Sequence, residues 1–451
     1  MLWCNNLILE TVKNIIGKYS LCDNCLGRQF ALLITGLSNE TRGKALKTVL
    51  LMRAHKRVVG NENKEENLKL IEKIARNGQF IPARKTLEKY GIKVDEKKDC
   101  YICMGIMNNF DHYVKLVKNI IGSVEFNNFL VGSKFPSTIM EKEDSLRAQY
   151  KLNWGETIKG EFNRELGKLL LSNFEDKTVE FDRPEIVIVI NIKKDEVELN
   201  INPLFIFGRY LKLIRGIPQT HWTCKNCNGQ GCEECDNKGY KYKTSVEELI
   251  SEKVIEICEG SGSKFHGAGR EDIDALMLGT GRPFVIEIKN PKKLFIDLDN
   301  LKQEINAYAK EKVQVIDLEF SDRDRIRNIK ANAQMARKTY RATVKISSEI
   351  HENKIKNLET LLSDVKIDQR TPNRVLHRRA DKVRRKKIYS FSVSEISSNQ
   401  FIATINTQGG TYIKELISGD EGRTHPNVSE LLGGVECIVQ KLDVIEVDSK
   451  Y

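Results

Sequence analysis

Gly267-Ala-Gly-Arg-Glu-Asp-Ile-Asp-Ala-Leu-Met-Leu-Gly-Thr-Gly-Arg-Pro-Phe284 holds two arginines, three carboxylates and four glycines, and it runs into the apolar segment Phe284 to Ile288. Its glycines allow positive φ and close approach of the backbone to a ligand. Arg270 stands two residues before Asp272, and an arginine can hold a nearby carboxylate bidentately and keep it ionised. The stretch therefore predicts a loop that presents one reactive carboxylate ahead of a strand. The alternative is an ordinary solvated turn.

Strand patterns dominate the half of the chain that contains this loop. Several of them alternate apolar and polar residues, as half-buried strands do. The predicted strands are 283–289, 313–320, 340–346, 388–394, 401–405 and 437–447, and the predicted helices are 244–259 and 298–312. Few helices among many strands indicate an α+β fold built on a mostly antiparallel sheet.

The first half of the chain has a different pattern. Apolar residues recur at helical spacing in 7–18, and helices are also expected in 40–60 and 62–98. The runs 186–192 and 197–201 are strands joined by a short charged turn, which predicts a hairpin. Proline and glycine then cluster between 203 and 218, which suggests a domain boundary near residue 216.

Length and charge suggest the kind of partner. A chain of 451 residues exceeds one ordinary core, so two or three domains are expected. Its formal net charge is +11, which suggests a polyanionic partner, most often nucleic acid, although a generally basic proteome would give a similar total. The charge is concentrated, because residues 370–387 contain nine lysines or arginines and one acid, Asp381.

Nothing in the sequence indicates a membrane protein. The first residues lack the basic and apolar regions of a signal peptide. No apolar run approaches the roughly 20 residues that span a bilayer. We therefore expect a cytoplasmic protein without a membrane partner. In that reducing compartment the eleven cysteines are not expected to form a disulfide framework.

Eight of the eleven cysteines occur as C-x-x-C pairs, a spacing typical of metal ligands. Cys224, Cys227, Cys232 and Cys235 form a tight double pair that predicts a tetrahedral zinc site. Cys22/Cys25 and Cys100/Cys103 are predicted to form a second, joint site. Four thiolates leave no position for a substrate, so both sites are expected to be structural. The single residues Cys4, Cys258 and Cys437 are expected to be buried.

Gly269-Arg-Glu-Asp272 followed by Met277-Leu-Gly-Thr-Gly-Arg-Pro-Phe284 resembles the catalytic motif of the archaeal and eukaryotic tRNA pseudouridine synthases of the Pus-ten family. Other segments resemble the same family, in order along the chain. They are Cys22-Asp-Asn-Cys-Leu-Gly-Arg-Gln-Phe30, Gly208-Arg-Tyr-Leu-Lys212 with Gln219-Thr-His-Trp222, Gln369-Arg-Thr-Pro372 with His377-Arg-Arg-Ala-Asp381, and Gly410-Thr-Tyr-Ile-Lys-Glu415 with Gly419-Asp-Glu-Gly-Arg-Thr424. The compact Cys224 to Cys235 cluster fits the archaeal branch.

The resemblance implies three regions. These are a helical zinc-binding region at 1–105, a THUMP-like RNA-binding domain at 106–215, and a pseudouridine synthase catalytic domain at 216–451 with a zinc ribbon at 222–240. It also implies isomerisation of uridine at position 55, and at position 54, of the TΨC arm of tRNA. Structural Zn²⁺ is expected, with no organic cofactor and no obligate protein partner.

The same resemblance assigns the site residues. Asp272 is expected to be the catalytic carboxylate, with Arg270 holding it in place, and Tyr340 is expected to stack against the uracil. Asp274 is the nearest competitor for the catalytic role, and Glu271 is expected to be structural. Ile413, Lys414 and Leu442 are expected to line the pocket. The predicted RNA-binding residues are Arg370, Arg374, Arg378, Arg379, Arg384 and Arg385.

Two other functions fit the residues. Asp272 or Asp274, followed by Glu287-Ile-Lys289, mimics the pattern that holds Mg²⁺ beside a scissile phosphate in nucleases. A non-catalytic tRNA-binding protein would also have a concentrated positive charge. Chelator sensitivity separates the nuclease from an isomerase, and replacement of Asp272 separates the binding protein.

Overall fold

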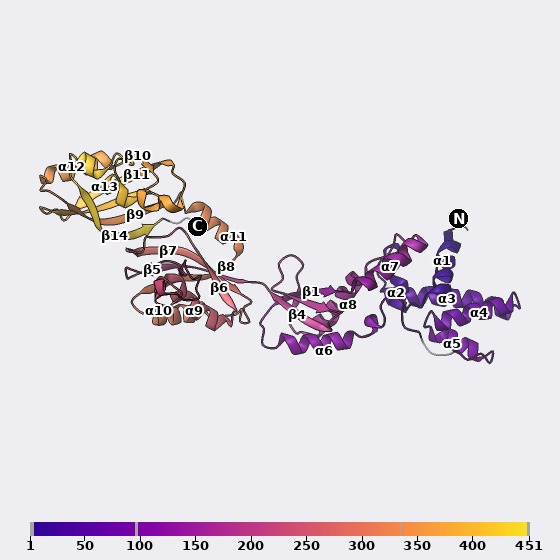
Figure 1. Cartoon of the computed structure of the whole chain (residues 1–451). Helices are drawn as coiled ribbons and strands as arrows, with labels where there is room; N and C mark the ends of the chain where they lie inside the picture. Colours follow the sequence, from indigo (N-terminus) through magenta and orange to yellow (C-terminus); the bar gives the residue numbers. More distant parts are fainter. Residues whose placement is uncertain (1–3, 95–97, 334, 449–451) are drawn as a thin grey trace. The chain divides into compact units, whose positions relative to one another are not determined.

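A computed structural model of the chain describes residues 4–94, 98–333 and 335–448. The chain divides into two compact units, the first ending at Ile201 and the second beginning at Asn202 (Figure 1). Among the described residues, no helix combines the length and the apolar character needed to cross a membrane.

Helices form most of the N-terminal unit. Those expected at 7–18 and 40–60 are present, and the region 62–98 contains two shorter helices, with residues 95–97 outside the described residues. The bounds of the helices in this unit are α1 Cys4–Lys18, α2 Asp23–Arg28, α3 Asn39–Val59, α4 Lys64–Arg76, α5 Ile81–Glu88, α6 Phe110–Ile121, α7 Ser137–Tyr150 and α8 Ile158–Asn173. The long helix α3 begins at a capping residue, because Ser38 Oγ accepts a hydrogen bond from the backbone of Thr41.

The N-terminal unit also contains a four-stranded sheet in the order β2-β1-β3-β4. Its strands are β1 Asn128–Lys134, β2 Thr178–Val179, β3 Ile186–Asn191 and β4 Glu196–Ile201. Strands β3 and β4 form the predicted antiparallel hairpin. One continuous core joins this sheet to the helical region, from Val12 in α1 to Ile190 in β3. Residues 1–105 and the expected domain at 106–215 therefore do not have separate hydrophobic cores.

The C-terminal unit is built on one large sheet in the order β13-β10-β11-β12-β9-β14-β7-β5-β8, with β6 added beside β7. Only β14 and β7 run parallel, so the predicted, mostly antiparallel sheet is confirmed. The strands are β5 Leu204–Lys212, β6 Gly262–Gly267, β7 Ala275–Lys289, β8 Val313–Ser321, β9 Arg337–Ile346, β10 Val365–Arg370, β11 Val383–Ser394, β12 Gln400–Gln408, β13 Thr424–His425 and β14 Cys437–Val447.

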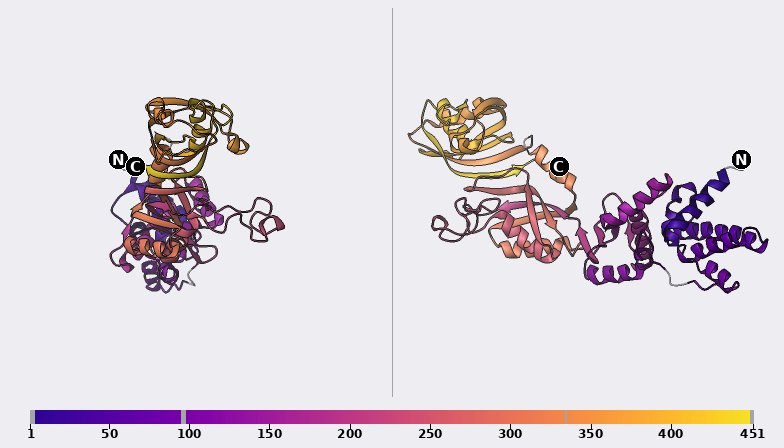
Figure 2. Two further views of the ribbon diagram at one scale, coloured as in Figure 1. Left: turned by 90° about the vertical axis from the view of Figure 1, so that its left-hand side faces the viewer. Right: turned by 45° about the vertical axis from the view of Figure 1, so that its right-hand side comes forward.

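Two large cores cover the two halves of this sheet, and a smaller cluster packs α11 residues Ile326 and Ile329 against Val285. Helices α9 and α10 pack over the half that contains β5 and β8, and α12 and α13 pack over the half that contains β11 and β12 (Figures 1 and 2). The helices are α9 Val246–Cys258, α10 Leu298–Ala309, α11 Arg323–Asn332, α12 Glu352–Leu362, α13 Ile413–Ser418 and α14 Val428–Leu431. Tyr340, on the middle strand β9, contacts both cores.

The boundary expected near residue 216 is wrong, because β5 belongs to the C-terminal sheet. It pairs with β7 on one side and β8 on the other, and its residues Ile206 and Tyr210 are buried in that core. Gly208 lies in the middle of this strand rather than at a linker. A Cβ there would lie 2.6 Å from Leu318 and 3.1 Å from Phe284, so glycine is needed for close packing.

Candidate active site

Asp272 lies on the loop between β6 and β7, and Lys212 holds the backbone of that loop. Lys212 ends β5 and is fully buried. Its Nζ donates to the carbonyl oxygens of Ile217, Asp272 and Ile273 over 3.1, 3.0 and 3.1 Å. An ammonium group has three protons to donate, and here each has an acceptor. Lys212, which is distant in sequence, therefore fixes the backbone position of Asp272.

A buried ion pair fixes the residue before Asp272. Arg282 Nε lies 2.7 Å from Glu271 Oε2, and both side chains are 1% exposed. Tyr210 donates its hydroxyl proton to the same carboxylate over 2.9 Å, and Arg282 Nη1 donates to the carbonyl oxygen of Ala268 over 3.0 Å. These contacts tie both ends of the segment 268–271 to the sheet. They fit the structural role expected for Glu271.

The carboxylate of Asp272 points into a pocket and faces two cations. Its Oδ2 lies 3.1 Å from Arg374 Nη1 and 3.8 Å from Lys414 Nζ. Arg374 also donates from Nε to Glu415 Oε1 over 2.6 Å. Arg270, which was expected to hold Asp272, lines the same pocket. Arg374 and Lys414 are cations that face the Asp272 carboxylate.

Asp274 has a different setting from Asp272. Its side chain is 66% exposed, and Lys414 Nζ lies 2.7 Å from its Oδ2. Burial alone would raise the pKa of Asp274, but the hydrogen bond and the charge of Lys414 outweigh it and hold that pKa below its usual range. Lys414 thus bridges the two candidate carboxylates, and Asp274 lies on the solvent side.

The pocket in front of Asp272 has a volume of about 150 Å³, comparable to a cavity that holds a benzene-sized ring. Every residue expected to form the catalytic and uracil-binding site lines it, namely Arg270, Asp272, Tyr340, Ile413, Lys414 and Leu442. Its floor crosses three neighbouring strands, because Leu442 in β14 lies opposite Ala275 in β7 and Val444 lies opposite Tyr340 in β9. The buried Tyr340 hydroxyl has its pKa raised to about 12 by desolvation, so it stays protonated.

One wall of the pocket is set by Gln369. This side chain is 1% exposed, accepts from the backbone N–H of Tyr412 over 2.9 Å and donates to the carbonyl oxygen of Tyr412 over 3.0 Å. The paired contacts fix the start of α13, from which Ile413 and Lys414 extend. Gln369 belongs to the Gln369-Arg-Thr-Pro372 segment, so that motif has a positioning function here.

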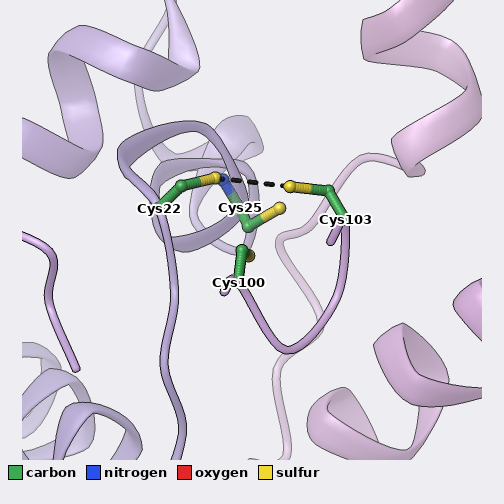
Figure 3. Close-up of side chains that lie close together, drawn as sticks. All are labelled: Cys22, Cys25, Cys100 and Cys103. Carbon is green, nitrogen blue, oxygen red and sulfur yellow. Dashed lines mark hydrogen bonds between the residues drawn. The ribbon is translucent and has the colours of Figure 1, made fainter. Parts of the chain in front are cut away.

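Two tetra-cysteine clusters are present, and each brings its four Sγ atoms within 4.8 Å of one another. Figure 3 shows the sulfurs of Cys22, Cys25, Cys100 and Cys103 turned toward one another, which confirms that the two distant pairs meet. The Sγ atoms of Cys22 and Cys103 are 3.7 Å apart. Tetrahedral zinc with Zn–S bonds of about 2.3 Å needs sulfurs roughly 3.8 Å apart. The cluster therefore has the geometry of a zinc site.

The second cluster lies between β5 and α9, on a loop that projects from the C-terminal unit (Figure 2). Its Sγ atoms are 3.8 Å apart both from Cys224 to Cys232 and from Cys227 to Cys235. Backbone N–H groups of Gly231 and Gly239 donate to Cys227 and Cys235 Sγ. Donors to sulfur stabilise thiolates, which are the form that binds zinc. Cys258 and Cys437 are buried, as expected, and the side chain of Cys4 lies outside those described.

The chain is similar to known proteins over most of its length. Residues 205–448 match the model of the Pus10 C-terminal domain, and residues 113–191 match the archaeal Pus10 THUMP domain. The chain is 42% identical to the tRNA pseudouridine synthase Pus10 of Methanocaldococcus jannaschii, over 96% of this chain and 93% of that protein. It is 38% identical to the protein of the same name from Methanothrix thermoacetophila, over 98% and 94% of the two chains. The chain belongs to the Pus10 family of tRNA pseudouridine synthases.

The basic run 370–387 lies beside the pocket of the Pus10 C-terminal domain, and most of its arginines have partners. Arg370 pairs with Asp381 at 2.7 Å and Arg385 with Asp368 at 2.9 Å. Arg384 donates to Thr371, and Arg379 donates to the hydroxyl of Tyr412. Within the run, Arg374 and Arg379 line the pocket. The side chain of Arg378 lies outside those described. Arg374, expected only as an RNA contact, is thus a partner of Asp272.

The nuclease alternative is not compatible with this Pus10 fold. Met277, near the start of β7, lies opposite Lys212 in β5, whereas Glu287 lies opposite Phe205. Phe205 and Lys212 are seven steps apart along β5, so Glu287 and Met277 are separated by roughly 23 Å at about 3.3 Å per residue. Glu287 instead accepts a hydrogen bond from His266 over 3.0 Å. Asp272 and Glu287 therefore cannot hold the same metal ion.

Proposed function

We propose that this protein isomerises uridine 55, and uridine 54 as a second target, in the TΨC loop of tRNA, with Asp272 as the catalytic carboxylate. Asp272 stands on a rigidly held loop, opposite Tyr340, in a pocket sized for one aromatic ring. That arrangement, in a member of this enzyme family, is the observation that carries the proposal.

The reaction requires one reactive carboxylate. The C1′–N1 bond of the uridine breaks and its electron pair leaves with the uracil. Asp272 either attacks C1′ or removes a ribose proton, and both roles need an ionised carboxylate. The base then turns, C5 bonds to C1′, and the proton on C5 is lost. Because the product is an isomer of the substrate, no redox or energy cofactor enters the chemistry.

Tyr340, Leu442 and Ile413 would hold the uracil. The ring of Tyr340 stacks on the base, while Leu442 and Ile413 cover its apolar side. A uridine in a tRNA loop is stacked or paired, and extruding it costs a few kcal/mol. Contacts to the flanking phosphates offset that cost. We assign these contacts to Arg370, Arg374, Arg378, Arg379, Arg384 and Arg385, together with the THUMP domain.

Both cysteine clusters would hold Zn²⁺ in a structural role. Four thiolates complete a tetrahedral site, so no position is left for a substrate or a water. Cys22, Cys25, Cys100 and Cys103 lie in the core of the N-terminal unit, and the second cluster closes a loop that would otherwise have few apolar contacts. The metal's contribution is thus to folding and not to the bond changes.

The test is to incubate the protein with three tRNA transcripts and to map pseudouridine by chemical labelling. One transcript carries both uridines, and the others carry cytidine at position 54 or at position 55. Pseudouridine is expected wherever position 54 or 55 still carries a uridine. The reactions contain EDTA in amounts that leave the structural zinc in place. Cleavage of the RNA, or no pseudouridine in any transcript, would contradict the proposal. If the Asp272→Ala variant bound tRNA as wild type does and gave the same yield of pseudouridine, the assignment of Asp272 would be contradicted.

A further inference from the structure

Lys338 is buried beside the catalytic pocket and has no acceptor among the described residues. Lys338 is 6% exposed, and its side chain lines the pocket together with Asp272 and Tyr340. Lys338 and Tyr340 are two residues apart on β9, so they extend from the same face of the sheet. No described residue accepts a hydrogen bond from its Nζ. Because Lys338 lines the pocket, its ammonium donors are available to a ligand there.

The charges around Lys338 are unbalanced. Arg282 approaches from β7, Lys386 from β11 and Glu271 from the catalytic loop. Glu271 is the one carboxylate among them, and it is already engaged by Arg282 and the Tyr210 hydroxyl. Lys338, Arg282 and Lys386 therefore have one nearby carboxylate, that of Glu271, which already accepts hydrogen bonds from other residues. The site has an excess of positive charge that a negatively charged or strongly polar ligand would neutralise.

Gly269 leaves room for this ammonium group at the edge of the pocket. It has a φ of +78°, and a Cβ built on it would lie 3.2 Å from Lys338 Nζ and 3.4 Å from Arg282 Nη1. Nζ thus lies under the segment that leads to Asp272, next to the space where the base would enter. Burial, followed by the charge of Arg282, lowers the pKa of Lys338 to about 7. A negative ligand is what would hold its proton there.

We propose that Lys338 is a further catalytic residue, which donates a hydrogen bond to a carbonyl oxygen of the uracil and stabilises the charge of that base as it leaves C1′. This inference rests on the proposed function. When the C1′–N1 bond breaks, its electron pair moves into the uracil and is shared by N1 and the carbonyl oxygens. That charge develops whether Asp272 attacks C1′ or removes a ribose proton. Lys338 then faces an anion that is absent in the bound substrate.

An interaction made mainly after the bond breaks affects turnover and not binding. Lys338→Met is expected to lower the single-turnover rate by about 100-fold, with the dissociation constant for tRNA unchanged. Lys338→Arg, which keeps a charge and donors, is expected to regain part of that loss. Lys345→Met is the matched control, because Lys345 lies on the exposed face of the same strand. It should leave both quantities unchanged.

Thio-substituted substrates report directly on the contact. Sulfur accepts a hydrogen bond more weakly than oxygen. With 2-thiouridine or 4-thiouridine at position 55 of the tRNA, the wild-type protein should therefore react more slowly with one of the two, the one whose sulfur replaces the oxygen that Lys338 contacts. Lys338→Met should show no such difference between sulfur and oxygen, and Lys338→Arg should retain it. A Lys338→Met rate within about threefold of wild type, or an equal sulfur effect in all three proteins, would overturn the proposal. Wild-type protein that forms no pseudouridine would instead contradict the proposed function itself.

Discussion

Asp272 and Arg374 form an ion pair in which Oδ2 and Nη1 are 3.1 Å apart. Arg374 comes from the segment after β10, 102 residues beyond Asp272 in the sequence. Its Nε is fixed by the buried carboxylate of Glu415, 2.6 Å away. The guanidinium is thus held between one half-buried and one buried acid, and it orients the carboxylate of Asp272.

Arg374→Met is expected to lower the rate constant of the bound complex, on the order of 10- to 100-fold, because Asp272 loses its closest cation. The measurement is single-turnover kinetics together with the dissociation constant for tRNA over a range of salt concentrations. Arg327→Met is the matched control, since Arg327 pairs with Asp324 on α11, outside the pocket and outside the assigned RNA contacts. A change in affinity and salt slope alone, with an unchanged rate, would make Arg374 only a phosphate contact.

Lys212→Met is expected to lower both stability and activity. Three buried carbonyl oxygens, including that of Asp272, would lose their donor, at a cost of roughly 1–3 kcal/mol for a buried group left unpaired. Thermal unfolding and single-turnover kinetics should both show the effect. Lys264→Met, on the exposed face of β6, is the control. An active and equally stable Lys212→Met protein would show that the loop holds its shape without this contact.

Lys338 should make stability depend on pH. Its pKa in the folded protein is lowered to about 7, so between pH 7 and its unfolded pKa of about 10.4 the unfolded chain binds more protons and stability rises with pH. Below pH 7 the buried charge destabilises the fold fully. Lys338→Met should therefore stabilise the protein at pH 6, on the order of 4 kcal/mol at about 1.36 kcal/mol per pKa unit.

That gain should shrink as the pH approaches 10. Denaturant unfolding of wild type and variant at several pH values measures it, and comparing the two cancels the pH dependence of the zinc sites. A difference that is the same at every pH would show that Lys338 keeps an ordinary pKa in the fold.

Replacing one cysteine of a cluster should remove one zinc ion from the protein and lower the stability of the part of the chain that holds that cluster. Cys25→Ser opens the buried cluster, and it should strongly destabilise the N-terminal unit because Cys25 lies in its core. Cys227→Ser affects a half-exposed ligand on the projecting loop, so the large sheet should unfold at nearly the wild-type temperature. Metal analysis and calorimetry measure both. Two ions retained in either variant would contradict the assignment.

The part of this structure that sequence could predict consists of local patterns and motifs. The hairpin β3–β4 follows from two runs rich in β-branched residues joined by a charged turn, and the cluster of four cysteines between 224 and 235 follows from spacing alone. Asp272, Tyr340 and Leu442 could be assigned to one pocket only through the family motif, because they come from three different elements.

The contacts that sequence did not predict join residues distant in the chain. Lys212 and Asp272 are 60 residues apart, and a buried lysine beside a glycine-rich loop has no local pattern. Residues 204–212, which form β5, fall inside the predicted THUMP-like region because the boundary is inferred from Pro203 and Gly216, and these residues are equally typical of a linker. Arg374 was assigned to RNA because it lies in a basic run, and only the fold shows that it meets Asp272.

The central claim is that Asp272 carries the reaction. It is tested most directly by single-turnover assays on an unmodified tRNA transcript with wild type, Asp272→Asn and Asp274→Asn. We expect pseudouridine from wild type and from Asp274→Asn. From Asp272→Asn we expect none, although that protein still binds the tRNA as tightly as wild type. Pseudouridine formed by Asp272→Asn at the wild-type rate would contradict the account.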